Sequence, residues 1–412
     1  MFEYTESYLK DFLFENNKVF FEVTIRCNME CYYCTYGELY QNSDSTSKSD
    51  LDFLIAKQLL DYLLKIWNSK KNRSFGKDIW ICFYGGEPLL NFNLIKKIVE
   101  YTDSNKLKYD RFRYSLTTNG LLLDKYSEFL VKKNFNLLIS LDGDERNNGY
   151  RLLKNKKHSY TKVIKNVFTL RKNNKKYFTE NIKFNSVLSD KNSVESIYDF
   201  MINSFEKKPK ISELDTTFIR PDKEKEFKKI YNTFANSINS SKKKSFLEKE
   251  YLMESPKGKF LVDYVYNNKK YFIKSFNDLL VDSNNNQSMT GSCIPLKHRI
   301  FLDTNGNIFP CERVSKDHVM GKVSKDGVDI WFKKISKKYN KIFKILSDHC
   351  ETCYRKSSCP VCILKIEKIR TNYKCPSWIN DKEYAKKLHE AKNFLAENRD
   401  LYPKISREIF FG

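Results

Sequence analysis

The sequence lacks any long apolar run. No uninterrupted apolar stretch in its 412 residues reaches the length of about 20 that a membrane-spanning helix needs. The first residues, MFEYTESYLKDFLFENN, carry acidic side chains among the apolar ones, so they do not form a signal peptide. These absences predict a cytoplasmic protein with no membrane contact. A content of 41% hydrophobic residues is enough for two or more packed domains.

Internal repeats, low-complexity domains and a concentrated basic patch are also absent. The net charge is +23, but lysines are spread along the chain and mixed with asparagines, as in Lys70, Lys71 and Asn72. This distribution does not favour a nucleic-acid partner. It is compatible with a surface that attracts an acidic peptide.

Only one of the eleven cysteines is isolated in the sequence. Cys82 lies inside the apolar run Ile79 to Tyr84 and is predicted to be a buried small hydrophobic residue. The other ten form two groups. In a reducing compartment such groups favour metal or cluster ligation over disulfides.

The first group lies in the stretch Val19 to Gly37, where a β-type apolar run precedes Cys27, Cys31 and Cys34. The spacing is C-x3-C-x2-C. Three thiolates can hold three corners of a four-iron cluster and leave one iron open to a small molecule. A zinc site and a redox pair are the alternatives at this point.

Strand-like and helix-like patterns alternate about six times in the first half of the chain. A helix is predicted from Leu51 to Ile66, with Ser49 as its N-cap. After the run that begins at Val19, the further strand candidates are Asp78 to Tyr84, Phe112 to Thr117, Leu137 to Leu141, Ile182 to Leu188 and Leu214 to Ile219. This alternation predicts a parallel α/β sheet, open or closed into a barrel.

Unusual residues follow four of these strands. They are Cys27 to Cys34, Gly85 to Glu87, Thr118 to Gly120 and Ser140 to Gly143. Ligands bind at the carboxyl ends of parallel strands, so these segments are expected to share one pocket.

The second cysteine group begins with a predicted β-hairpin. The Asn305-Gly306 pair separates the short apolar runs Ile300 to Leu302 and Ile308 to Phe309, and the hairpin would present Cys311. The complete group is Cys293, Cys311, Cys350, Cys353, Cys359, Cys362 and Cys375. The part from Cys350 to Cys362, taken alone, fits a zinc ribbon equally well.

The first group resembles the signature of radical S-adenosylmethionine enzymes, in which Tyr33 would be the aromatic residue before the last cysteine. The resemblance implies that the amino and carboxylate groups of S-adenosylmethionine chelate the open iron. One electron then cleaves the sulfonium to a 5′-deoxyadenosyl radical that takes a hydrogen atom from the substrate. It also implies a partial (β/α)6 barrel similar to a TIM barrel.

The second group resembles the SPASM domain, a small cysteine-rich domain with a β-hairpin, short helices and two auxiliary four-iron clusters. The resemblance assigns Cys293, Cys311 and Cys362 to the first cluster. It assigns Cys350, Cys353, Cys359 and Cys375 to the second. One departure from the family pattern is that two residues, not three, separate Cys359 from Cys362. The first cluster is one cysteine short, which leaves an open iron or a different fourth ligand.

The same resemblance suggests cofactor contacts. Gly85, Gly86 and Glu87 match the GGE motif that holds the methionine amino group, and Tyr33 would pack beside adenine. Candidates for ribose and carboxylate contacts are Ser140, Arg151 and Asn185. Each of these three is equally well explained as an ordinary polar residue at a strand end or helix start.

Glu312 directly follows Cys311. In the sulfatase-maturing branch of the family an acidic residue in this place acts as a base, which makes Glu312 the candidate catalytic residue. The alternative is a surface carboxylate paired with Arg313 or a lysine.

Together these features predict a maturase that crosslinks a ribosomally made precursor peptide through a thioether or carbon–carbon bond. A sulfatase-maturing enzyme is the second candidate, although that branch more often has Gln in the place of Tyr84. A zinc-rich nucleic-acid-binding protein would not explain the Gly85 to Glu87 turn. The partners expected are the precursor peptide and an electron donor of the flavodoxin or ferredoxin type. Because no leader-binding domain fits before Val19, a leader peptide would be recognised by a separate leader-binding protein or by the core's own surface.

The expected domain order has five parts. They are an N-terminal extension (1–18), the radical S-adenosylmethionine barrel (19–220), a bridging region (221–286), the SPASM domain (287–380) and a C-terminal helical tail (381–412).

Overall fold

The structure is a computed structural model that describes residues 3–41, 50–74, 76–108, 111–267, 294–353, 359, 361–366, 375 and 378–411. The chain forms two compact units. The core unit comprises Leu13–Lys242 and Leu296–Ile330, and the helical unit comprises Met1–Phe12, Lys243–Pro295 and Trp331–Gly412. The region predicted as one SPASM domain therefore contributes its hairpin to the core unit and its later cysteines to the helical unit.

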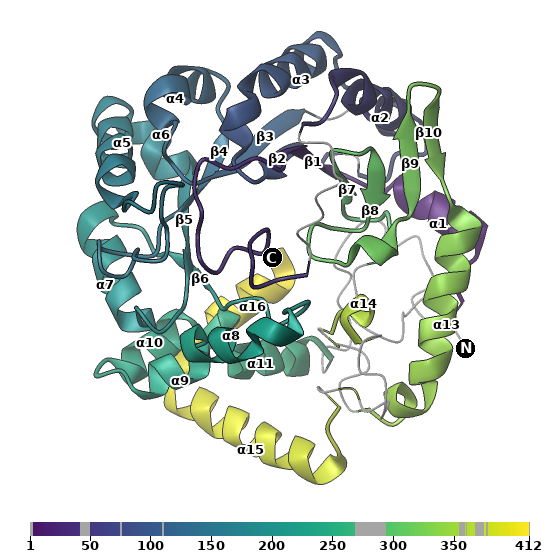
Figure 1. Cartoon of the computed structure of the whole chain (residues 1–412). Helices are drawn as coiled ribbons and strands as arrows, with labels where there is room; N and C mark the ends of the chain where they lie inside the picture. The colour runs from purple at the N-terminus through teal and green to yellow at the C-terminus, as the bar shows by residue number, and fades with distance from the viewer. Residues whose placement is uncertain are drawn as a thin grey trace. The chain divides into compact units, whose positions relative to one another are not determined.

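The core unit is built on one sheet with the strand order β10-β9-β8-β7-β1-β2-β3-β4-β5-β6. Six of its strands are parallel and follow one another in chain order, with helices on their outer face (Figure 1). These are β1 (Lys18–Thr24), β2 (Ile79–Gly85), β3 (Phe112–Thr118), β4 (Asn136–Ser140), β5 (Ile182–Val187) and β6 (Lys210–Ser212). The predicted α/β class and partial (β/α)6 barrel are confirmed.

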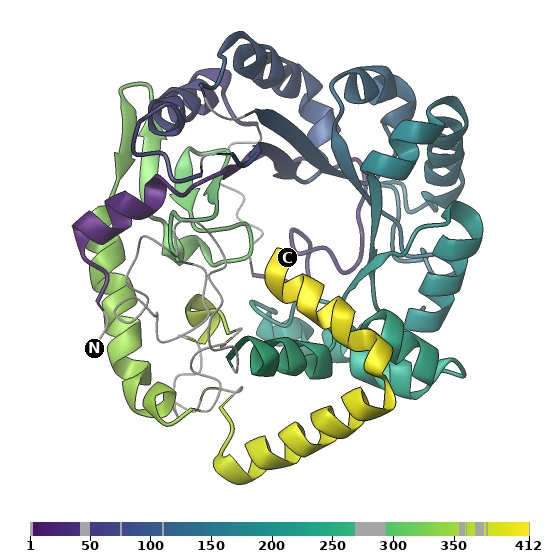
Figure 2. The same cartoon turned by 180° about the vertical axis from the view of Figure 1, so that it is seen from behind.

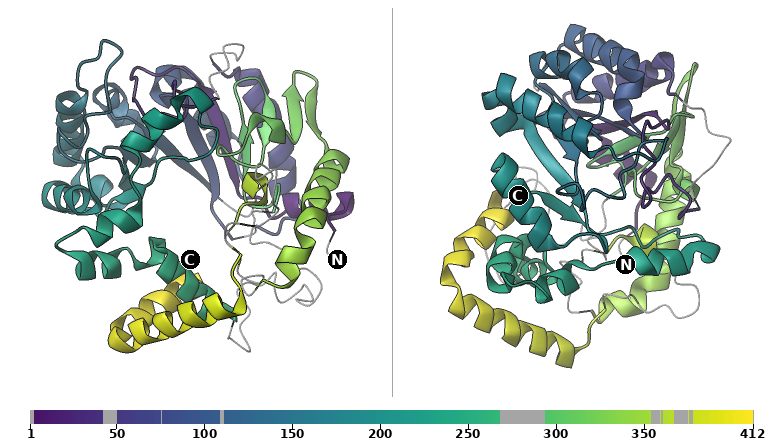
Figure 3. Two further views of the ribbon diagram at one scale, coloured as in Figure 1. Left: turned by 60° about the horizontal axis from the view of Figure 1, so that its bottom comes forward. Right: turned by 60° about the vertical axis from the view of Figure 1, so that its left-hand side comes forward.

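Alternation along the strands fixes which face meets the helices. Val19, Phe21 and Val23 of β1 are fully buried, whereas Phe20 and Glu22 lie on the opposite face. The covering helices carry matching apolar stripes. They are α2 (Phe53–Trp67), α3 (Phe92–Ser104), α4 (Leu123–Lys132), α5 (Tyr160–Asn173), α6 (Lys175–Asn181) and α7 (Val194–Phe205). Figure 3 shows this arrangement from two other sides.

Helix α2 begins later than predicted. Asp52 is its N-cap, because the Asp52 side chain accepts a hydrogen bond from the Leu54 backbone N at 2.7 Å. A carboxylate is favoured there by the positive end of the helix dipole. The predicted cap, Ser49, lies outside the described residues.

The prediction of the sixth strand was wrong in position. Strand β6 pairs Lys210 to Ser212 with the last residues of β5, which ends at Val187. The predicted segment, Leu214 to Ile219, begins where β5 no longer offers a partner, and Ile219 makes only an isolated bridge with Tyr40. Its apolar residues instead pack under the loops, as Leu214 does. Apolar content indicated burial there, not strand pairing.

The predicted hairpin is confirmed. Strands β7 (Ile300–Leu302) and β8 (Asn307–Phe309) are antiparallel. One oxygen of Asp303 accepts from the backbone N atoms of Asn305 and Asn307, and Gly306 has a φ of +84°. β7 pairs in parallel with β1, so the hairpin extends the barrel sheet. A second hairpin, β9 (Gly321–Ser324) and β10 (Gly327–Ile330), continues it.

The remaining elements are helical. In the core unit they are η1 (Pro88–Asn91), η2 (Pro221–Lys223), α8 (Glu224–Ile230), α9 (Phe234–Asn239) and η4 (Lys316–His318). The others are α1 (Glu6–Leu13), α10 (Lys244–Glu250), η3 (Leu252–Glu254), α11 (Pro256–Asn267), α13 (Phe332–Glu351), α14 (Ile363–Ile366), α15 (Asp381–Glu397), η6 (Arg399–Leu401) and α16 (Tyr402–Phe411). Within the helical unit α15 and α16 lie beside α11 (Figure 2), where Leu261, Ala391 and Ile405 share a core. Among the described helices, none has both the length and the apolarity needed to cross a membrane.

Candidate active site

The three cysteines of the first group lie on a loop after β1, here called the cysteine loop (residues 25–37). Its backbone is fastened to the segment that follows β4. Glu30 N donates to Leu152 O at 2.8 Å and Tyr32 N donates to Tyr150 O at 3.0 Å. The cysteine loop therefore has a fixed path at the carboxyl edge of the sheet.

Cys27, Cys31 and Cys34 are half-buried free thiols. Burial raises the pKa of all three, and that of Cys31 to about 12. Charges on Cys27 and Cys34 also raise the pKa of Cys31. Bound iron would keep them as thiolates.

The donor set fits a four-iron cluster. Among the described residues, no three or more His, Cys, Asp or Glu side chains are arranged to hold a metal ion together. A four-iron cluster does not need such convergence, because each thiolate binds a different iron. Three soft sulfur donors would occupy three corners of the cluster.

The glycines after β2 lie directly against the start of the cysteine loop. Gly86 N donates to Thr24 O at 2.9 Å and Glu87 N donates to Arg26 O at 2.8 Å. Gly85 has a φ of +134°, and a Cβ atom there would lie 2.0 Å from Thr24 O. A Cβ on Gly86 would lie 2.4 Å from Arg26 O. Glycine is therefore required at both positions for this close approach.

Glu87 is completely buried, and its carboxylate joins the ends of β2 and β3. It accepts hydrogen bonds from Asn119 N at 2.7 Å, from Thr118 Oγ1 at 2.8 Å and from Leu89 N at 3.2 Å. Burial raises its pKa to about 7. The Asn119 side chain in turn lies 3.8 Å from the sulfur of Cys27. That Glu87 also holds the methionine amino group stays a prediction.

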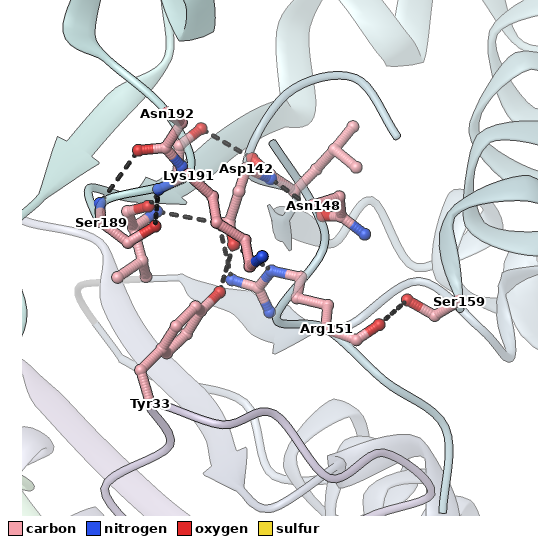
Figure 4. A network of polar contacts seen from close by, with 11 residues as sticks. Tyr33, Asp142, Asn148, Arg151, Ser159, Ser189, Lys191 and Asn192 are labelled. Atoms are coloured by element: carbon pink, nitrogen blue, oxygen red, sulfur yellow. Dashed lines mark hydrogen bonds and ion pairs between the residues drawn. The ribbon is translucent and has the colours of Figure 1, made fainter. Parts of the chain in front are cut away.

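A second buried carboxylate, Asp142, follows β4 and meets both Tyr33 and Arg151 (Figure 4). The Tyr33 hydroxyl donates to one Asp142 oxygen, and Arg151 Nη2 donates to the other at 3.1 Å. The guanidinium carbon lies 5.5 Å from the centre of the Tyr33 ring. Tyr33 and Arg151 were predicted to contact the cofactor, and those contacts stay predictions. Both polar groups are engaged by Asp142.

Ser140 and Asn185 are brought side by side. They are register partners of β4 and β5, so their side chains share one face of the sheet. Ser212 of β6 donates a hydrogen bond to the Asn185 side chain at 3.0 Å. Their predicted contacts with S-adenosylmethionine remain untested.

Glu312 lies after β8 and is paired with two arginines. Its carboxylate is 3.3 Å from Arg299 Nη1 and 3.5 Å from Arg313 Nε. The alternative interpretation of Glu312 was a surface carboxylate paired with Arg313 or a lysine. The pairing with Arg313 agrees with it, but the Glu312 side chain is only 11% exposed and is therefore not a surface group. Burial and then the charge of Glu312 raise the pKa of Tyr84, which the charge of Cys34 raises as well. Its role as a base stays a prediction.

Two residues of the site were missed in the sequence. Glu22 of β1 is buried, accepts from the Tyr36 hydroxyl at 2.6 Å and from Thr304 N at 3.3 Å, and so links the cysteine loop to the first hairpin. Its position inside the apolar run VFFEV was the available signal. Asp142 was predicted only as part of the segment Ser140 to Gly143 at a strand end, without a role of its own.

The second cysteine group is divided. Cys311 belongs to the core unit, whereas the five cysteines from Cys350 to Cys375 belong to the helical unit, and Cys293 lies outside the described residues. Cys350 is at the end of α13, and Cys353 N donates to its carbonyl at 3.3 Å. The assignment of these cysteines to two clusters stays a prediction. Cys82 is buried, as predicted.

Residues 21–201 match the family described as the radical SAM superfamily. The chain is 33% identical over 172 residues to the radical SAM cyclopropyl synthase TigE of Paramaledivibacter caminithermalis, covering 40% of this chain and 34% of TigE. It is 26% identical over 305 residues to a cysteine-type anaerobic sulfatase-maturating enzyme of Clostridium novyi, covering 69% and 70% of the two chains. Native anSMEcpe, solved with bound AdoMet and Kp18Cys peptide, has a TM-score of 0.58 at 16% identity and covers 96% of this chain and 99% of its own.

A parallel α/β sheet with three cysteines at its carboxyl edge defines the class, and the family match agrees with it. Residues 21–201 form a radical SAM domain. It spans less than half of the length of two curated relatives that it matches, 48% of one and 34% of the other. The likeness to the solved structure is one of fold.

Proposed function

We propose that this chain is a peptide-modifying enzyme that cleaves S-adenosylmethionine at a four-iron cluster held by Cys27, Cys31 and Cys34. The observation that carries the proposal is the meeting of the cysteine loop with the Gly85-Gly86 turn, where the donor set fits the cluster. With S-adenosylmethionine bound, such a cluster supplies the electron that yields a 5′-deoxyadenosyl radical.

The protein's own residues would position these groups. Gly85 and Gly86 bring the backbone close to the cysteine loop, and Glu87 fixes the ends of β2 and β3 beneath it. Ser140 and Asn185 offer polar groups on one face of the next two strands. Glu312 would accept the proton released when the substrate is oxidised.

The substrate we propose is a ribosomally made precursor peptide, and the product an intramolecular thioether or carbon–carbon crosslink. The similarity to TigE, described as a cyclopropyl synthase, supports bond formation. Formylglycine formation on a sulfatase is the second candidate. It is favoured by the match with a sulfatase-maturating enzyme over 69% of this chain.

Further cofactors and partners belong to the same proposal. Two auxiliary four-iron clusters would use Cys293, Cys311 and Cys362, and Cys350, Cys353, Cys359 and Cys375. An electron donor of the flavodoxin or ferredoxin type would reduce the cluster at Cys27, Cys31 and Cys34. A separate protein would bind the leader peptide.

The test begins with anaerobically reconstituted protein. Three four-iron clusters correspond to about twelve irons per chain. Changing Cys27, Cys31 and Cys34 together to Ala should abolish 5′-deoxyadenosine formation, whereas the matched control C82A should retain it. Zinc with little iron, or undiminished cleavage in the triple variant, would refute the proposal.

The two candidate reactions are separated by the substrate. One sample receives the proposed precursor peptide, and the other a cysteine-containing sulfatase peptide. Loss of two hydrogens from the first supports crosslinking. Replacement of the thiol group by an aldehyde in the second supports sulfatase maturation.

A further inference from the structure

Tyr33, Asp142 and Arg151 form a buried network between the cysteine loop and the end of β4 (Figure 4). The side chains of Asp142 and Arg151 are 1% and 8% exposed. A buried ion pair is costly to form unless its remaining polar atoms are satisfied. Asp142 meets this condition, since it also accepts from Val187 N at 2.8 Å.

Arg151 is tied to the cysteine loop through its neighbours as well. The carbonyls of Tyr150 and Leu152, on either side of it, accept the two backbone hydrogen bonds from Tyr32 and Glu30. The rings of Tyr32 and Tyr150 stack at 5.3 Å. A shift of Arg151 would therefore move the backbone that holds the segment between Cys27 and Cys34.

The positive charge of this network lies beside the cysteine loop. The guanidinium carbon of Arg151 is 5.5 Å from the ring centre of Tyr33, which stands between Cys31 and Cys34 in the sequence. Two contacts with Asp142 hold the guanidinium there, one from Nη2 at 3.1 Å and one from Nε at 3.0 Å.

We propose that Arg151 is a positioning residue, which acts through the cysteine loop, and not a direct ligand of S-adenosylmethionine. Held by Asp142 under Tyr33, its guanidinium fixes the path of the cysteine loop and keeps a positive charge beside Cys31 and Cys34. A positive charge stabilises the reduced, more negative state of a cluster bound there. The electrostatic part of this inference rests on the proposed function.

The test compares the variants R151Q and D142N, which remove opposite charges. The reduction potential of the cluster at Cys27, Cys31 and Cys34 is measured by redox titration. This cluster is followed by the electron paramagnetic resonance signal that changes when S-adenosylmethionine is added. R151Q should lower the ratio of reduced to oxidised cluster at a fixed potential by about tenfold, a shift of about 59 mV for one electron. D142N should raise the potential. The double variant, neutral at both positions, should have a potential between those of R151Q and D142N.

If R151Q and D142N shifted the reduction potential equally and in the same direction, the electrostatic part would be overturned. A loosened cysteine loop would change the potential regardless of the sign of the charge removed. An unchanged potential in R151Q with weaker binding of S-adenosylmethionine would overturn the whole proposal. Arg151 would then be a cofactor ligand.

Positioning is tested separately on metal-free protein by hydrogen exchange. R151Q should speed exchange of the Glu30 and Tyr32 amides about tenfold, and exchange in β2 should not change. Unchanged exchange at Glu30 and Tyr32 would contradict positioning. R151K keeps the charge without the two contacts to Asp142, so it serves if R151Q does not fold, with faster exchange and a potential near that of the unaltered protein. A chain that forms no cluster would refute the proposed function and leave the exchange test valid.

Discussion

Arg299 and Glu312 close the open end of the first hairpin, with Arg299 Nη1 3.3 Å from Glu312 Oε2. Arg299 precedes β7 and Glu312 follows β8, one residue after Cys311. Arg313 approaches the same carboxylate at 3.5 Å, so two positive charges face one negative charge. The carboxylate is thereby fixed in place beside a predicted cluster cysteine.

Replacing Glu312 by Gln should separate cofactor cleavage from product formation. 5′-Deoxyadenosine should still form, while peptide product should fall about 100-fold or more, the usual contribution of a general base. Both species can be quantified by mass spectrometry in one reaction. The control is R313Q, because the Arg313 side chain is 63% exposed and its pairing with Glu312 should contribute less than about 1 kcal/mol to stability. Full product from E312Q would leave Glu312 as a structural partner of Arg299.

Gly85→Ala should be among the most destabilising single changes in the core unit. The new Cβ would lie 2.0 Å from Thr24 O, which the sheet pairing holds in place. The matched control is Gly327→Ala, because Gly327 has a similar φ of +138° but no atom within 4 Å of an added Cβ. Backbone strain alone costs about 1–3 kcal/mol, so urea unfolding should show a clearly larger loss for G85A than for G327A. Equal losses would mean that the Thr24 contact relaxes freely.

Much of the fold was readable from local sequence patterns. Val19, Phe21 and Val23 at alternate positions indicate strand β1, and the Asn305-Gly306 pair indicates the first hairpin. The position of β6 was not readable, because it depends on where β5 ends. Pairing between strands is a property of two segments, and one segment cannot reveal it.

The site was readable only in part for the same reason. The cysteines and glycines follow strands, and parallel strands share an edge, so their proximity could be expected. Glu22 pairs with Thr304, which lies 282 positions away, and Tyr33 reaches an aspartate 109 positions away. Such contacts depend on the path of the whole chain. Arg151 shows the consequence, since its polar character suggested a cofactor ligand while the fold pairs it with Asp142.

Glu87 should make the metal-free protein less stable as the pH rises from about 4.5 to about 7. Its carboxyl has an ordinary pKa of 4.5, which burial raises to about 7 in the folded state. The folded state therefore binds more protons than the unfolded state in this interval, and stability is lost as Glu87 ionises. The upper bound of this loss is roughly 3 kcal/mol.

Urea unfolding at about pH 5 and about pH 8 measures this difference. E87Q cannot ionise, so its stability should change less between the two pH values than that of the unaltered protein. Only the difference between the pH values is compared, because the Gln amide also disturbs the hydrogen bonds to Thr118 and Asn119. The same dependence on pH in both proteins would assign it to other groups, such as Glu22, whose pKa burial also raises.

Replacing Cys311 by Ala should stop the reaction after cofactor cleavage. Peptide crosslinking leaves a radical on the substrate that must lose an electron, and a cluster held by Cys311 would accept it. The sheet pairing of β8 with β7 and β9 does not depend on the Cys311 thiol, so the core unit should remain folded. We expect the loss of about four irons, detectable 5′-deoxyadenosine and no peptide that has lost two hydrogens. Circular dichroism and unaltered β1–β7 hydrogen exchange would establish that the variant is folded. Normal crosslinked peptide from a folded variant that lacks those irons would reduce the auxiliary cluster to a structural element.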